Sequence, residues 1–294
     1  MSPVRRCVLV AFGWSWALGG ILFALCAAGL ETPRSALALS VAYMFGPLLG
    51  AVAARRAEGQ RGLEPTGAFR VNAWWAVARF APLAYTAAAL CVSLALPGLS
   101  LNLDPGSLLD RFGRNLPPEA LEQGRARIAA LPGWVLPVVF AGQSLVAGAT
   151  VNAAAAFGEE YGWRGYLHEA WAPLGPWRAS LSIGALWGAR HLPLVLMGHN
   201  YPQHPALGAL WVIAWCTLMG PLFFLLRART GSAVAPAIAH GTLNACGGMA
   251  LLFVRGGNDP TAGITGLPGI AVAALAVALL AWRGGLRAQA GTRS

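Results

Sequence analysis

Charged residues are scarce in this 294-residue chain. Only 11% of its residues are Asp, Glu, Lys or Arg, whereas about a quarter are charged in a typical soluble domain. Lysine is absent, so all 21 basic residues are arginine, and only 11 residues are acidic. Hydrophobic residues make up 56% of the chain, and the mean hydropathy is +0.56. This composition excludes an ordinary soluble domain and predicts an all-α polytopic membrane protein.

Cysteine is also sparse, and its placement excludes two classes of site. The cysteines are odd in number, scattered, and within or beside apolar runs, so they suggest neither a disulfide framework nor a CxxC metal site. We expect them to act as small buried hydrophobes. They are Cys7, Cys26, Cys91, Cys216 and Cys246.

Several protease motifs are missing. The zinc motif His-Glu-x-x-His has a near match at residues 168–172, but its last position is Ala172. There is no Gly-x-Ser-x-Gly elbow, and Asp259 is the only aspartate in the last third of the chain. These absences exclude an HExxH metalloprotease, a serine-elbow hydrolase and a paired-aspartate site.

Long apolar runs are abundant. A helix of about 20 apolar residues crosses a bilayer, and this length predicts about eight spans. The arginines gather at alternate span ends, which predicts a multi-pass protein of the cell membrane with both termini cytoplasmic. The same distribution indicates orientation in a bilayer rather than nucleic-acid binding. The predicted spans are approximately 7–30, 35–54, 73–98, 132–157, 177–198, 206–226, 232–254 and 265–282.

No internal repeat or composition break divides the chain, so residues 1–294 are predicted to form a single membrane domain. The longest connection, residues 99–130, mixes acidic residues with arginines and is interpreted as a solvated outer connector. Its segment 118–130 begins with proline and predicts a short surface helix.

A charged cluster follows the fourth predicted span. It contains Glu159, Glu160 and Arg164, although a charge at the bilayer centre costs roughly 3 kcal/mol. Residues four apart share a helix face, so Glu160 is predicted to pair with Arg164, and Glu159, about 100° away, is predicted to be left free. The alternative is an ordinary ion pair where a helix meets solvent at the membrane surface.

Two later apolar runs each contain a histidine. His191 and His240 need a polar partner or a wet cavity in such surroundings, and Asn244 shares a helix face with His240. Arg190 faces another direction, so it either contacts a substrate carboxylate or extends to the membrane surface. His199 and His204 are interpreted as surface residues of a short outer loop.

These side chains are the groups that amide hydrolysis needs. A carboxylate in a low-dielectric pocket can take a proton from water, and imidazole or carboxamide N–H groups can stabilise the oxyanion that follows. Glu160 beside Arg164 would stay ionised, so the two adjacent carboxylates would have different roles.

Three motifs occur in order: Glu-Glu-x-x-x-Arg at 159–164, aromatic-x-x-x-His at 187–191 and His-x-x-x-Asn at 240–244. Together they resemble the CPBP family of intramembrane proteases, the CAAX-protease and bacteriocin-processing group. The resemblance covers a protease-like core at about residues 150–250. One departure is Trp187, where phenylalanine is common. Tryptophan fills the same apolar space but adds an N–H that needs a partner.

The resemblance implies a helical membrane fold with a water-filled cavity open toward the cytoplasm. It implies an endopeptidase that cuts near the C-terminus of a membrane-associated peptide or protein, lipid-modified ones included. Glu159 would activate water, Glu160 and Arg164 would orient it, and His191, His240 and Asn244 would hold the water and the oxyanion. A mechanism without a metal is preferred. Zinc held by two histidines and a carboxylate stays open as an alternative.

A competing function is a non-catalytic membrane protein that uses the same polar cavity. It would be an immunity factor, a scaffold or a small transporter. Loss of the carboxylate and both histidines would leave a scaffold intact but would abolish a protease.

Overall fold

The computed structural model describes residues 1–60, 63, 70–104, 118–129 and 131–286. The described chain is almost entirely helical. Its strands are β1 (Ser100–Leu101) and β2 (Val254–Arg255), which pair antiparallel with Ser100 opposite Arg255. The predicted all-α class is confirmed.

The first part of the chain forms five described helices. The predicted second span contains two helices that meet at Phe45 and together form one apolar stretch, Pro33–Ala57. The helix predicted in the 99–130 connection is present. In chain order the helices are α1 (Pro3–Ala27), α2 (Pro33–Met44), α3 (Gly46–Ala57), α4 (Trp74–Leu94) and α6 (Pro118–Ala129).

The middle of the chain contains the first motif. Helices α7 (Val135–Ala149) and α8 (Val151–Glu160) continue into a π-helical segment, η2 (Tyr161–Leu167), then α9 (His168–Ala170) and the 3₁₀ turn η3 (Ala172–Leu174). The Thr150 hydroxyl donates to the Val146 carbonyl at 2.7 Å, and the helix axis bends by 49° there. A threonine that bonds back to the preceding turn commonly bends a helix.

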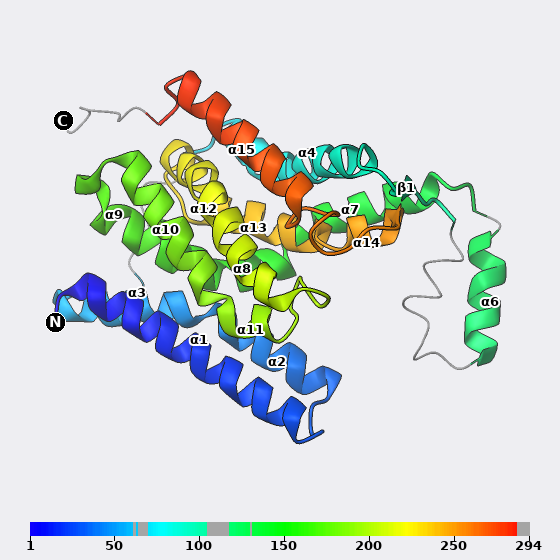
Figure 1. Cartoon of the computed structure of the whole chain (residues 1–294). Helices are drawn as coiled ribbons and strands as arrows, with labels where there is room; N and C mark the ends of the chain where they lie inside the picture. The colour runs from blue at the N-terminus through cyan, green and yellow to red at the C-terminus, as the bar shows by residue number, and fades with distance from the viewer. Residues whose placement is uncertain (61–62, 64–69, 105–117, 130, 287–294) are drawn as a thin grey trace.

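The last part of the chain supplies the remaining helices. They are α10 (Pro176–Arg190), α11 (Leu192–Leu196), α12 (Pro205–Thr230), α13 (Val234–Cys246), α14 (Met249–Phe253) and α15 (Leu267–Trp282). In Figure 1, α1, α2 and α3 lie along one side of the group formed by α8, α10, α12 and α13. Helices α4 and α15 lie along the opposite side, and α6 stands apart at one end.

All eight predicted spans coincide with helices of the structure. Within the described residues, four helices are long and apolar enough to cross a membrane: Pro3–Ala27, Pro33–Ala57, Trp74–Leu94 and Pro205–Thr230. The bent pair Val135–Ala149 and Val151–Ala170 would make a fifth. The polytopic membrane architecture is confirmed, and eight crossings stay a prediction.

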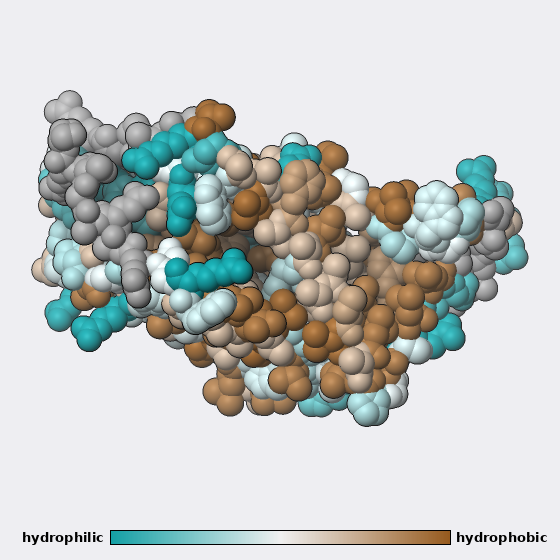
Figure 2. Space-filling view, turned by 90° about the horizontal axis from the view of Figure 1, so that it is seen from above, coloured by the Kyte–Doolittle hydropathy of each residue, from teal (hydrophilic) through white to brown (hydrophobic). Residues whose placement is uncertain are grey.

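The surface supports this architecture. Large apolar side chains are exposed on several helices, including Val146, Leu210 and Leu275. Figure 2 shows hydrophobic side chains across the middle of one face, with hydrophilic side chains toward its two ends. A soluble monomer rarely exposes so broad an apolar surface, whereas lipid covers one in a bilayer.

Glycines allow the central helices to approach closely. A Cβ on Gly241 of α13 would meet backbone atoms of Gly148, Asn152 and Ala153 in α7 and α8. Small residues at such crossings let membrane helices pack backbone to backbone. The close approach holds α13, and with it His240, against α8.

Replacing Gly241 by alanine should therefore destabilise the fold. We expect the free energy of unfolding to fall by about 1–3 kcal/mol, because a backbone neighbour cannot move aside as a side chain can. Thermal unfolding in detergent measures the change. Gly142→Ala in α7 is the matched control, since a Cβ there has open space. Equal unfolding temperatures for the two variants would contradict the packing argument.

Candidate active site

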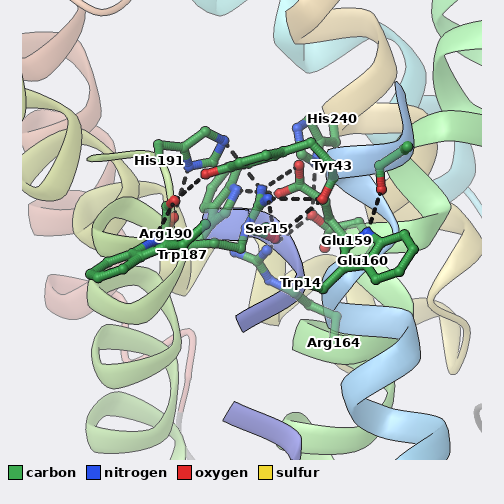
Figure 3. A network of polar contacts seen from close by, with 12 residues as sticks. Trp14, Ser15, Tyr43, Glu159, Glu160, Arg164, Trp187, Arg190, His191 and His240 are labelled. Atoms are coloured by element: carbon green, nitrogen blue, oxygen red, sulfur yellow. Dashed lines mark hydrogen bonds and ion pairs between the residues drawn. The ribbon is translucent and has the colours of Figure 1, made fainter. Parts of the chain in front are cut away.

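A cavity of about 340 Å³ lies between the central helices. Four of the six predicted site residues line it: Glu159 of α8, His191 after α10, and His240 and Asn244 of α13. Glu160 and Arg164 lie behind the cavity wall and are buried. Figure 3 shows how the charged and aromatic side chains of this region converge from several helices.

Glu159 is not free, contrary to the prediction. Its Oε1 lies 2.5 Å from Nη2 of Arg190, and the Glu159 and Arg190 residues are 1% and 0% exposed. Its Oε2 accepts a hydrogen bond of 2.8 Å from the indole N–H of Trp187. The partner of Glu159 therefore comes from α10, a different helix, which the spacing of residues on α8 could not indicate.

Glu160 pairs with Arg164, as the i,i+4 spacing predicted. Glu160 Oε1 lies 3.0 Å from Arg164 Nη1 and 2.9 Å from His240 Nδ1. The pair forms although the intervening turn is π-helical rather than α-helical. Arg164 also lies over the rings of Trp187 and Phe223, 4.8 and 4.7 Å from their centroids. A buried charge needs such compensation, because water cannot reach it.

The hydrogen bonds of the two histidines define what each presents to the cavity. His191 Nδ1 lies 2.8 Å from the Trp187 carbonyl oxygen, which can only accept, so this nitrogen carries the proton. In neutral His191, Nε2 then has a lone pair, and Arg190 Nη2 lies 3.3 Å from it. Neutral His191 therefore has no ring N–H left to donate to an oxyanion.

His240 is held differently. Its Nδ1 donates to the Glu160 carboxylate, and its ring packs edge-on against Trp187 with centroids 5.1 Å apart. Its Nε2 can donate to an oxyanion only when the ring is an imidazolium, because Nδ1 already holds the proton of the neutral ring. Asn244 lines the same cavity four residues further along α13 and is exposed.

Comparison with protein families gives a match to the part of the chain that carries these residues. Residues 141–246 match the family described as type II CAAX prenyl endopeptidase Rce1-like. Over these residues the chain is similar to that family, and we refer to them as the Rce1-like segment. The predicted resemblance to the CAAX proteases of the CPBP family is confirmed, and the Rce1-like segment contains all six predicted site residues. A search of curated proteins finds no match.

The Rce1-like segment does not build the whole site. Ser40 and Tyr43 of α2 also line the cavity, and both lie outside the Rce1-like segment. Sequence reasoning also dismissed His199, which lines the cavity together with Asn200. The indole N–H of Trp187 did indicate that a buried hydrogen-bond acceptor lies nearby. Nothing in the sequence indicated that His199 or the N-terminal helices would line the cavity.

Two features of the described geometry bear on the zinc alternative. In the part of the chain that the structure describes, no three His, Cys, Asp or Glu side chains gather so as to hold a metal ion. Both oxygens of Glu159 already accept hydrogen bonds, from Arg190 and Trp187.

Proposed function

We propose that this protein is a membrane endopeptidase that hydrolyses a peptide bond near the C-terminus of a membrane-associated peptide or protein. Lipid-modified substrates fall within this class. The observation that carries the proposal is the coincidence of the Rce1-like match with one cavity lined by Glu159, His191, His240 and Asn244. A carboxylate, two imidazoles and an amide around one hollow are the groups that peptide hydrolysis uses.

Glu159 is the general base of the proposed reaction. Arg190 holds its carboxylate in the ionised form, which can accept a proton. Each carboxylate oxygen has two lone pairs, so a water molecule can still bind beside the Arg190 and Trp187 hydrogen bonds. His191 Nε2 has a single lone pair, so it accepts a hydrogen bond from this water in place of its 3.3 Å contact with Arg190 Nη2. Attack of the water oxygen on the substrate carbonyl transfers one water proton to Glu159.

His240 and Asn244 stabilise the oxyanion that this attack creates. The Asn244 amide donates an N–H in any protonation state, and His240 donates through Nε2 as an imidazolium. Glu160 fixes the orientation of His240, and Arg164 balances the charge of Glu160. Collapse of the intermediate breaks the C–N bond, and Glu159 returns its proton to the leaving amine.

The protein is proposed to work in the cell membrane with both termini in the cytoplasm, so that the substrate C-terminus enters from the cytoplasmic side. The arginines at span ends support this orientation. The mechanism is proposed to need no metal, because the oxygens of Glu159 are engaged by N–H donors.

The test is cleavage of a quenched fluorescent C-terminal peptide library by the purified protein in detergent. We expect cleavage that persists in a strong zinc chelator. Activity abolished by chelator and restored by Zn²⁺ would overturn the metal-free mechanism but not the protease. Absence of cleavage, with proton-coupled flux in vesicles instead, would replace the protease by a transporter.

A further inference from the structure

Arg190 is the last residue of α10, and its side chain contacts residues of three other helices, α1, α2 and α8. Its Nη2 contacts both groups that face the proposed water: Oε1 of Glu159 at 2.5 Å and Nε2 of His191 at 3.3 Å. Its Nη1 donates to the Ser15 hydroxyl of α1 and to the Tyr43 carbonyl of α2, each at 3.3 Å. Figure 3 shows the Arg190 side chain lying among these partners.

The backbone of Arg190 is anchored by the same two helices. The Tyr43 hydroxyl and the Trp16 indole N–H both donate to the Arg190 carbonyl. The guanidinium also lies over the Tyr43 ring, 4.7 Å from its centroid. Arg190 is 0% exposed, so it does not extend to the membrane surface, and it does not line the cavity. A direct contact with the substrate carboxylate is therefore not its role in this structure.

We infer that Arg190, held by Ser15 and Tyr43 of the N-terminal helices, is a positioning residue that orients Glu159 toward the attacking water. The inference rests on the proposed function. It makes α1 and α2, which lie outside the Rce1-like segment, a working part of the site. The planar guanidinium suits this task, because its forked N–H groups bind partners in fixed directions.

Several other titratable groups surround Glu159, and none replaces Arg190. Arg190 is the permanent cation in contact with Glu159, while the neighbouring imidazoles change charge with pH. Removing that cation makes the ionised carboxylate harder to maintain. The other groups that interact with Glu159 are His191 of α10, His240 of α13, Tyr43 of α2, His199 of the following loop and Cys216 of α12.

The decisive experiment compares Arg190→Gln and Arg190→Lys with the wild-type protein in the peptide cleavage assay. For Arg190→Gln we expect kcat to fall about 100-fold, because a misplaced base loses most of its effect. We expect KM to stay within about twofold, because Arg190 does not line the cavity. In Arg190→Gln, the acidic limb of the pH profile of kcat/KM should move to higher pH. In Arg190→Lys, the acidic limb should return part of the way to its wild-type position, because a cation is present again, but kcat should recover little.

Arg55→Gln is the matched control. Arg55 is also a buried, ion-paired arginine, but its partner is Glu169 and it does not contact Glu159. We expect Arg55→Gln to keep the wild-type pH profile. An Arg190→Gln protein with wild-type kcat and an unmoved acidic limb would overturn the inference.

Ser15→Ala tests whether Arg190 is a positioning residue even if the Arg190 variants do not fold. It removes one anchor of the guanidinium without leaving a charge unpaired, and Ser15 does not line the cavity. We expect kcat to fall about 3- to 10-fold, the worth of one hydrogen bond. Ser180 is a buried serine whose hydroxyl, among the described residues, donates to the Trp177 carbonyl of its own helix, so Ser180→Ala should keep the wild-type rate. Equal rates for the two serine variants would contradict the inference about Arg190 but not the proposed function. A wild-type protein that cleaves no peptide would contradict the proposed function.

Discussion

Glu159→Gln should lower kcat for peptide cleavage by about 10²- to 10⁴-fold, the range that a general base typically contributes. Glutamine has nearly the same shape, and its amide oxygen can still accept from Trp187 or Arg190. It cannot take a proton from water at neutral pH. The variant should therefore bind substrate with little change in KM and turn it over at a residual rate.

The measurement is single-turnover cleavage of the best library peptide by purified wild-type and variant proteins. Glu169→Gln is the matched control. Glu169 pairs with Arg55 and Arg227, its side chain is 44% exposed, and it does not line the cavity, so its replacement leaves the groups around the proposed water in place. Unfolding in detergent shows whether each variant is folded. A folded Glu159→Gln protein with a wild-type rate would refute a glutamate-based protease.

Arg164→Met should lower the free energy of unfolding by about 3–5 kcal/mol, because it leaves the Glu160 carboxylate buried without its cation. Glu160 is 0% exposed, so water cannot take over the role of Arg164. Methionine keeps an apolar stem against Trp187 and Phe223, where the guanidinium lies in the wild-type protein.

Adding Glu160→Gln to Arg164→Met should recover most of that stability. The double variant contains no unpaired charge, and the glutamine oxygen can still accept from His240 Nδ1. Denaturant unfolding of the two single variants and the double variant gives the interaction free energy between the residues. Additive effects, with no recovery in the double variant, would show that the ion pair is not what balances the charge of Glu160.

The all-α membrane class was predictable from the sequence, because the length and apolarity of a run are local properties. Each of the eight apolar runs is helical in the structure. The Glu160–Arg164 pair was predictable for the same reason, since residues four apart meet on any turn near helical geometry. The order of the three motifs indicated the family, and the Rce1-like match confirmed it.

Contacts between helices were decided only by the tertiary structure. Glu159 was predicted to be free because nothing on its own helix pairs with it, yet Arg190 of α10 does. Ser15 and Tyr43 reach Arg190 from helices far away in the sequence, and His199 reaches the cavity from a loop. Helical spacing determines which residues share a face. Which faces then meet depends on bends such as the one at Thr150 and on close approaches such as the one at Gly241, and these arise only when the whole chain packs.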